Sequence, residues 1–168
     1  MRVFLVGYMA SGKSGLGKEL AKLMDFSFVD TDQLVQMETG KSVNTIFREY
    51  GENYFRKCEH EALLTTAGQN DIVVATGGGL PCFYDNMEWM NQHGCTVYLK
   101  ATPAALLSRL LASRESRPLL KDVSDDQLLV TIEQHLLERE PAYSKAKIIV
   151  PALSLKAATV KKMISEIS

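Results

Sequence analysis

The chain has 168 residues, which is enough for one full hydrophobic core and too few for two ordinary domains, so we expect a single domain over residues 1–168. Its hydrophobic fraction of 46% and charged fraction of 23% are close to globular averages, which argues against a disordered, fibrous or membrane-spanning chain. The formal net charge of −1, without a block of basic residues, argues against a nucleic-acid partner.

The cysteines and the N-terminal segment bear on the compartment. The three cysteines form no CxxC pair and are odd in number, which fits a reduced interior better than a disulfide framework. The apolar run at residues 3–6 is far shorter than the hydrophobic part of a signal peptide or a membrane span. We therefore expect a cytoplasmic protein without a membrane partner. We also expect a monomer, because no exposed apolar helix face stands out.

Short apolar strands alternate with helical patterns in the first half of the chain. Residues 2–6 form the first strand, and the glycine-bearing loop after it leads into a helical pattern through Leu16, Leu20 and Leu23. The elements that we expect next are a strand at 26–29, a helix at 33–39 closed by Gly40, a helix at 42–50 capped by Ser42, a helical segment at about 51–67 and a strand at 72–76.

The same alternation continues in the second half. Polar residues at 113–127, interrupted by Pro118, predict an excursion from the fold, and we assign residues 113–124 to a lid. The other expected elements are a helix at about 82–93, a strand at 95–99, a helix from Pro103 to about 112, a helix at about 125–139, a strand at 147–152 and a helix at about 155–167. Five such strands predict a three-layer α/β/α fold with a parallel sheet, and ligands at the carboxyl ends of its strands.

The loop after the first strand carries the most specific motif. Residues 7–14, GYMASGKS, satisfy G-x-x-x-x-G-K-[ST] between a strand and a helix, the pattern of a phosphate-binding P-loop. Its backbone N–H groups and the following helix end favour phosphate, Lys13 is expected at the β- and γ-phosphates, and Ser14 at Mg²⁺. The residues expected at ATP in this loop are Ala10, Ser11, Gly12, Lys13, Ser14 and Gly15. The alternative is a glycine-rich turn with a solvated lysine.

Acidic residues follow the second strand. Asp30 and Asp32 are two positions apart, so in extended geometry their side chains face the same side. One carboxylate can hold the water shell of Mg²⁺ while the other accepts the proton of an attacking hydroxyl. The alternative is that this segment only caps a helix, through Thr31 or Asp32.

Arginines and a second glycine loop suggest a site for a small acid. Arg56 has Glu59 and His60 three and four positions further on, which is typical of an ion pair, often at the surface. Gly77, Gly78 and Gly79 follow a buried strand and can form an anion-binding nest of N–H groups. Together they favour an acceptor with a carboxylate, which a guanidinium binds in a bidentate way.

Further arginines lie near the lid. Arg114 and Arg117 precede Pro118, and Arg139 lies at the end of the expected helix 125–139. Lid arginines that close over the phosphates supply charge to the transition state and exclude water. Each of them, taken alone, is also explained as a solvated surface residue.

Taken in order, GYMASGKSGLG, DTD, FRKCE, GGG, RPLL and REPAY resemble the motifs of shikimate kinases over residues 7–143. The resemblance implies a P-loop fold of the nucleoside-monophosphate-kinase type and transfer of the ATP γ-phosphoryl group to the 3-hydroxyl of shikimate, on the pathway to chorismate and aromatic amino acids. It implies Ser14 as a Mg²⁺ ligand with Asp30 acting through water, Asp32 as the base, and Arg117 on ATP. Shikimate-binding positions are Asp32, Arg56, Gly77, Gly78, Gly79 and Arg139.

The chain departs from the family pattern at two P-loop positions and near the lid. Gly15 replaces the usual threonine, Ala10 replaces a frequent glycine, and the stretch before RPLL is about one residue longer. The loop at 151–155 is expected beside the adenine, with Arg109 as a match to the arginine that stacks on it. Two alternatives stay open: a gluconate-type kinase of another small acid, and a non-catalytic ATP-binding module of the same fold.

Overall fold

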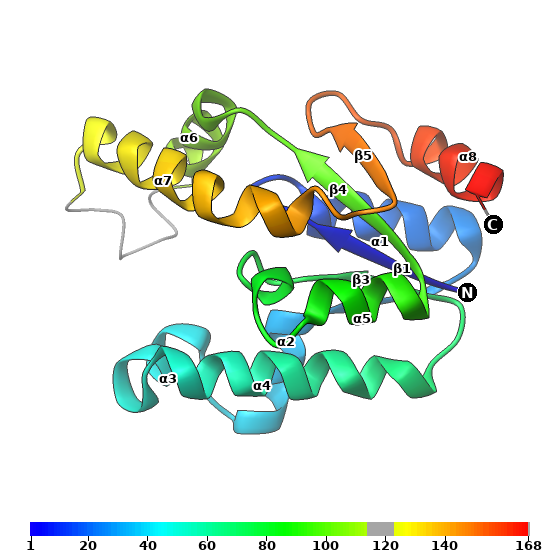
Figure 1. Cartoon of the computed structure of the whole chain (residues 1–168), viewed down its shortest axis with the longest axis horizontal. Helices are drawn as coiled ribbons and strands as arrows, with labels where there is room; N and C mark the ends of the chain where they lie inside the picture. The colour runs from blue at the N-terminus through cyan, green and yellow to red at the C-terminus, as the bar shows by residue number, and fades with distance from the viewer. Residues whose placement is uncertain (114–122, 168) are drawn as a thin grey trace.

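The computed structural model describes residues 1–113 and 123–167 (Figure 1). Its centre is a five-stranded sheet in the order β2-β3-β1-β4-β5, in which every neighbouring pair is parallel. This confirms the parallel sheet predicted from the sequence. The strands are β1 (Arg2–Val6), β2 (Ser27–Asp30), β3 (Ile72–Ala75), β4 (Cys95–Lys100) and β5 (Ile148–Pro151).

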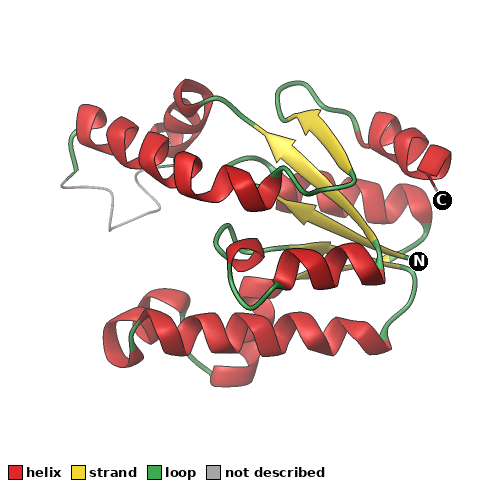
Figure 2. Ribbon diagram, in the orientation of Figure 1, coloured by secondary structure: helices red, strands yellow, loops and turns green. Residues whose placement is uncertain are grey.

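Helices cover both faces of this sheet, which gives the predicted three layers (Figure 2). One face packs on the apolar sides of α1 and α8, and the other on α4, α5 and the end of α7. The helices are α1 (Lys13–Met24), α2 (Thr31–Thr39), α3 (Val43–Tyr50), α4 (Glu52–Thr65), α5 (Asn86–His93), α6 (Pro103–Ala112), α7 (Asp125–Tyr143) and α8 (Ala157–Ile167). No described helix has both the length and the apolar character that a membrane crossing requires.

Most helix boundaries lie within about two residues of those predicted, and the start of α5 and the end of α7 differ by more. Helix α5 begins at Asn86 rather than near residue 82, because Tyr84 and Asp85 have left-handed backbone angles (φ 52° and 53°) that an α-helix does not accept. Helix α7 continues past Arg139 to Tyr143 with Pro141 inside it. Tertiary contacts stabilise that last turn, since Tyr143 is fully buried.

The predicted lid lies mostly outside the described residues. Of positions 113–124, the structure describes only 113, 123 and 124, so Arg114, Arg117 and Pro118 are not among the described residues. Ser124 is described, and it caps α7 by accepting a hydrogen bond from the N–H of Gln127. The helix that follows the predicted lid therefore has a well-defined start.

Candidate active site

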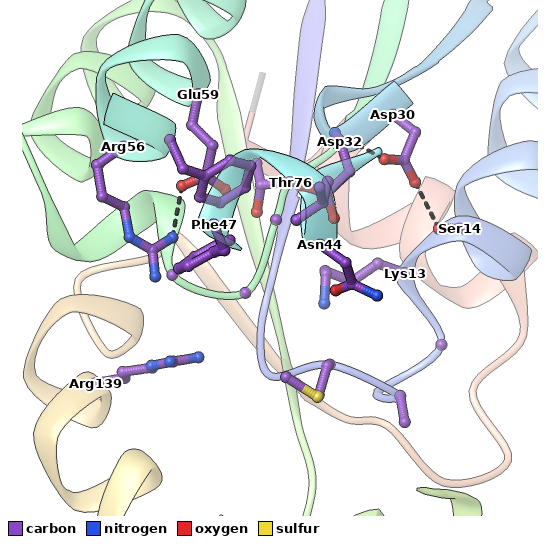
Figure 3. Close-up of a pocket in the computed structure, with 18 of the residues that line it drawn as sticks. Lys13, Ser14, Asp30, Asp32, Asn44, Phe47, Arg56, Glu59, Thr76 and Arg139 are labelled. Carbon is purple, nitrogen blue, oxygen red and sulfur yellow. Dashed lines mark hydrogen bonds and ion pairs between the residues drawn. The ribbon is translucent and has the colours of Figure 1, made fainter. Parts of the chain in front are cut away.

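The carboxyl ends of β1, β2 and β3 border a cavity of about 490 Å³ (Figure 3). The sheet order places these three strands side by side, so segments that are far apart in the sequence meet at one edge. The cavity brings together nearly all of the predicted residues that the structure describes. Its lining includes Ala10, Gly12, Lys13, Ser14, Gly15, Asp30, Asp32, Arg56, Gly77, Gly78, Gly79 and Arg139.

The P-loop curls around the side chain of its own lysine. Gly7 and Gly12 have left-handed angles (φ 143° and 97°), and a Cβ atom at Gly7 would lie 2.9 Å from the carbonyl oxygen of Leu99. Lys13 Nζ donates to the carbonyl oxygens of Gly7 (2.7 Å) and Tyr8 (2.8 Å). Helix α1 begins at Lys13 without a side-chain cap, so its first N–H groups are open to an anion.

Burial lowers the pKa of Lys13 to about 8, although the carboxylates of Asp32 and Asp30 act in the opposite direction. An ammonium group that is desolvated in this way gains strongly from a bound phosphate. The lysine of this loop is therefore buried and hydrogen-bonded rather than solvated, in a geometry that suits phosphate.

Asp30 joins the P-loop to α2. Its Oδ2 accepts a hydrogen bond from the Ser14 hydroxyl at 2.8 Å, and its Oδ1 accepts one from the N–H of Asp32 at 3.0 Å. Asp30 is thus the N-cap of α2, so the segment does cap a helix, but through Asp30 rather than through Thr31 or Asp32 as the alternative had it. The predicted extended geometry is wrong, because Asp32 belongs to the first turn of the helix.

The Ser14 hydroxyl and the Asp30 carboxylate fit a hydrated magnesium ion. Both are hard oxygen donors, and Mg²⁺ keeps several of its waters when a protein offers few ligands. Among the described residues there is no cluster of three His, Cys, Asp or Glu side chains that could hold a metal by itself. The donor set therefore suits an ion that also binds phosphate and water.

Asp32 is a half-buried carboxylate with an open acceptor. Within the described part of the chain, its Oδ1 is buried and has no hydrogen-bond partner. Burial and the neighbouring Asp30 raise its pKa, against the opposing effects of Lys13 and Arg56. Because buried acceptors are rarely left unpaired in native proteins, this oxygen marks the place of a ligand donor such as a hydroxyl.

Arg56 is held by two carboxylates and three aromatic rings. Its guanidinium binds Glu59 at 2.6 Å and Glu52 at 3.1 Å, which confirms the predicted pair with Glu59 but places it in the interior rather than at the surface. The rings of Phe83, Phe55 and Phe47 lie 4.6, 5.4 and 5.9 Å from Arg56 Cζ.

The other side chain predicted as a partner of Arg56 lies elsewhere, since His60 Nδ1 contacts Asn86 Oδ1 at 2.6 Å. Burial raises the pKa of Glu59 to about 7, opposed by Arg56. Burial therefore favours the neutral form of Glu59, whereas the guanidinium of Arg56 favours the charged form.

The three consecutive glycines give room to charged side chains. They do not form the predicted nest, because none of them has a positive φ and the N–H of Gly77 donates to Thr31 Oγ1 at 2.9 Å. A Cβ atom at Gly77 would lie 2.7 Å from Asp32 Oδ1, and one at Gly79 would lie 2.6 Å from Arg56 Cζ. The chain needs glycine here so that Asp32 and Arg56 can lie against the backbone.

Arg139 approaches the cavity from α7. The nearest position of the glycine loop is Gly78, where a Cβ atom would lie 3.4 Å from Arg139 Nη1. Tyr143, one turn further along α7, donates its hydroxyl hydrogen to the carbonyl oxygen of Gly78 and so fixes this end of the helix. Within the described residues, Arg139 forms no ion pair with a carboxylate, in contrast to Arg56.

Several lining residues were not predicted from the sequence. Asn44, Phe47, Phe55 and Thr76 all line the cavity. The only signal for the two rings was their position on the helices beside Arg56, and Asn44 and Thr76 carried none. Glu59 was predicted only as an ion-pair partner.

A second hollow, of about 360 Å³, lies on the other side of the P-loop. Arg109 borders it and donates to the carbonyl oxygens of Ala10 (3.1 Å) and Ala152 (3.4 Å). The loop predicted beside the adenine contributes Ala152, Ser154 and Leu155 to its wall. A nucleotide whose phosphates lie on the P-loop can extend into this hollow.

The comparisons with known proteins all point in one direction. A family model described as shikimate kinase matches residues 9–168. A shikimate kinase of Phocaeicola vulgatus is 45% identical over 155 residues (92% of this chain, 89% of the relative), and one of Parabacteroides distasonis is 47% identical over 151 residues (90% and 87%).

Solved structures agree with the sequence relatives. The crystal structure of shikimate kinase from Bacteroides thetaiotaomicron superposes with a TM-score of 0.91 at 38% identity, covering 99% of this chain and 97% of the other. Shikimate kinase from Acinetobacter baumannii in complex with shikimate gives a TM-score of 0.83 at 30% identity, covering 99% and 91%.

Proposed function

The chain belongs to the shikimate kinase family, and from that premise we propose how its residues carry out the transfer of the ATP γ-phosphoryl group to the 3-hydroxyl of shikimate, giving shikimate 3-phosphate and ADP. This reaction belongs to the route to chorismate and the aromatic amino acids. The observation that carries the assignment of roles is the half-buried carboxylate of Asp32, whose buried Oδ1 has no hydrogen-bond partner among the described residues and whose charge is felt by Lys13 and Arg56.

The phosphates of ATP bind to the P-loop. Lys13 leaves the carbonyl oxygens of its own loop and binds the β- and γ-phosphates, and the N–H groups at the start of α1 receive the remaining oxygens. Ser14, with Asp30 acting through water, would hold Mg²⁺, which neutralises charge on the phosphates when it is bound.

The acceptor binds beside Asp32. Arg56 and Arg139 pair with its carboxylate, and the glycine loop at 77–79 allows the ring to approach the backbone. Asp32 accepts the hydrogen of the attacking hydroxyl; the hydroxyl oxygen forms a bond to the γ-phosphorus, and the bond from that phosphorus to the β,γ-bridging oxygen breaks. The leaving ADP keeps the electron pair of the broken bond, close to Lys13.

Three earlier predictions stay predictions. Arg117 is proposed to bind ATP as the lid closes, and it lies outside the described residues. The cytoplasmic location and the monomeric state likewise rest on the sequence alone.

The experiment that tests the reaction is ADP release from Mg·ATP by the purified protein with shikimate, with gluconate and without an acceptor. Release that depends on shikimate, together with a product of shikimate's mass plus one phosphate, supports the proposal. Release with gluconate instead would favour the gluconate-type kinase, and ATP binding without turnover on either acid would favour the non-catalytic module.

A further inference from the structure

Tyr8 belongs to the P-loop, but its side chain faces the helices. The residue is 3% exposed and packs against Leu106 and Leu110 of α6 and Leu128 and Ile132 of α7. Its carbonyl oxygen, in contrast, accepts a hydrogen bond from Lys13 at 2.8 Å. One residue therefore links the phosphate-binding backbone to the layer that carries Arg139.

Two side chains of α7 contact the ring of Tyr8. His135 Nδ1 lies 2.8 Å from the Tyr8 hydroxyl oxygen, and Arg139 Cζ lies 5.4 Å from the centroid of the ring. His135 and Arg139 are four residues apart, so they lie on the same face of the helix. A guanidinium over the face of a tyrosine ring is attracted by the negative charge of that face.

The position of Arg139 depends on neutral groups. Arg56 is oriented by Glu52 and Glu59, whereas Arg139 forms no ion pair with a carboxylate among the described residues. Among the described residues, the Tyr8 ring lies against its guanidinium. Such an arrangement leaves the guanidinium charge available to a carboxylate that comes from outside.

We propose that Tyr8 is a positioning residue for the acceptor, whose ring orients the guanidinium of Arg139 and is itself held by the hydrogen bond to His135. The inference rests on the proposed function, because it takes Arg139 as a ligand of the acceptor's carboxylate. Tyr8 would then act at both substrates, since its carbonyl oxygen already bonds to Lys13 of the P-loop. It also gives a function to His135, which lies outside the cavity.

Steady-state kinetics of four variants test this inference. Tyr8→Leu keeps apolar bulk but removes the aromatic face, so we expect the KM for shikimate to rise about 3- to 10-fold and to rise more than the KM for ATP. Tyr8→Phe and His135→Leu each break only the hydrogen bond, and we expect each to raise the KM for shikimate by about 2-fold. The double variant Tyr8→Phe/His135→Leu should match the single variants, because all three lack the same bond.

Leu106→Ala is the matched control, since it loosens the same apolar cluster at a fully buried position. It should lower the unfolding temperature and leave the KM for shikimate unchanged. An equal rise of both KM values in Tyr8→Leu, or a rise in Leu106→Ala as large as in Tyr8→Leu, would overturn the inference.

The single and double hydrogen-bond variants decide the matter if Tyr8→Leu does not fold. Multiplicative effects of Tyr8→Phe and His135→Leu would then contradict the inference. These outcomes all require a wild-type protein that phosphorylates shikimate. A wild type that neither binds nor phosphorylates it would overturn the proposed function itself, and the inference with it.

Discussion

The two halves of the cavity are built in different ways. The phosphate half is one continuous segment, residues 7–15, whose lysine bonds to carbonyl oxygens of the same loop. The acceptor half draws Asp32 from α2, Arg56 and Glu59 from α4, the glycine loop from the end of β3 and Arg139 from α7. The order of the strands and the packing of α2, α4 and α7 bring these segments together.

The difference also concerns charge. In the phosphate half, partial charges of the backbone and one helix end do most of the binding, and they cannot be misplaced without unfolding the loop. In the acceptor half, buried side chains of opposite charge form ion pairs, as Arg56 and Glu59 do at 2.6 Å. Removing one partner of such a pair leaves the other charge buried and unpaired, so the acceptor half is the more sensitive to single substitutions.

The largest effect is expected from Asp32→Asn. An amide cannot accept the proton of the acceptor hydroxyl, so kcat should fall at least ~10²-fold, whereas the dissociation constant of ATP should stay nearly unchanged. The turnover number reports on the acceptor half, and equilibrium binding of ATP reports on the phosphate half. Asp71→Asn, at an exposed carboxylate bonded to the N-terminal amine, is the control and should leave both values unchanged. A near-normal kcat in Asp32→Asn would remove this residue from the mechanism.

A smaller effect, again confined to the acceptor half, is expected from Gly79→Ala. The new methyl group would lie 2.6 Å from Arg56 Cζ, so the guanidinium must move. We expect kcat/KM for shikimate to fall on the order of 10-fold, since a displacement of 1 Å can cost up to 10²-fold. Gly68→Ala is the matched control, because nothing lies within 4 Å of the added atom. Equal kinetics of the two variants would show that Arg56 does not need the space at Gly79.

The pH dependence should separate the two halves. Burial lowers the pKa of Lys13 to about 8, so the ammonium loses its proton as the pH rises through that value. We therefore expect kcat/KM for ATP to fall about 4-fold between pH 7 and pH 8.5. At saturating ATP, the bound phosphates stabilise the charged lysine, and kcat should stay level over the same range. A level kcat/KM up to pH 9 would contradict the predicted titration of the free enzyme.

The acid side of the profile belongs to the acceptor half. Burial raises the pKa of both Asp32 and Glu59, the latter to about 7, so both carboxylates lose their charge as the pH falls. The kcat/KM for shikimate should fall with them. Glu59→Gln should alter the fall of kcat/KM for shikimate at acid pH and leave the fall of kcat/KM for ATP at alkaline pH unchanged. A change in the alkaline fall would show that the two halves of the cavity are not independent.

The sequence predicted the phosphate half of the cavity better than the acceptor half. The P-loop was recognised because consecutive residues encode its geometry, and the sheet was recognised because its strands are short apolar runs. Arg56 and the glycines were predicted as one site because together they favour a carboxylate, and the resemblance to shikimate kinases added Asp32 to them. The side chains that lie against the glycines were not predicted, since the closeness of Asp32 and Arg56 to the backbone depends on how α2 and α4 pack.

Two further features of the structure were not predicted from the sequence. The contact between Tyr8 and His135 joins residues 127 positions apart, and it forms only because α7 packs over the P-loop side of α6. The late start of α5 comes from two left-handed residues, Tyr84 and Asp85, whose types do not require that conformation. Long-range packing decides the first of these features and the backbone of two residues the second, so residue propensity predicts neither.

The smallest effect is expected from Gly15, where the resemblance to shikimate kinases led us to expect the hydroxyl of a threonine. Nothing lies within 4 Å of a Cβ atom there, so Gly15→Thr and Gly15→Ala both fit. Ala should stabilise α1 by about 1 kcal/mol and Thr by less, because Thr is a weaker helix former. Only Thr adds a donor beside the phosphates, so it should tighten ATP binding by a few-fold. Unfolding temperature should then rank Ala above Thr above Gly, whereas ATP affinity ranks Thr first. The same rank order in both measurements would mean that residue 15 acts on ATP through helix stability alone.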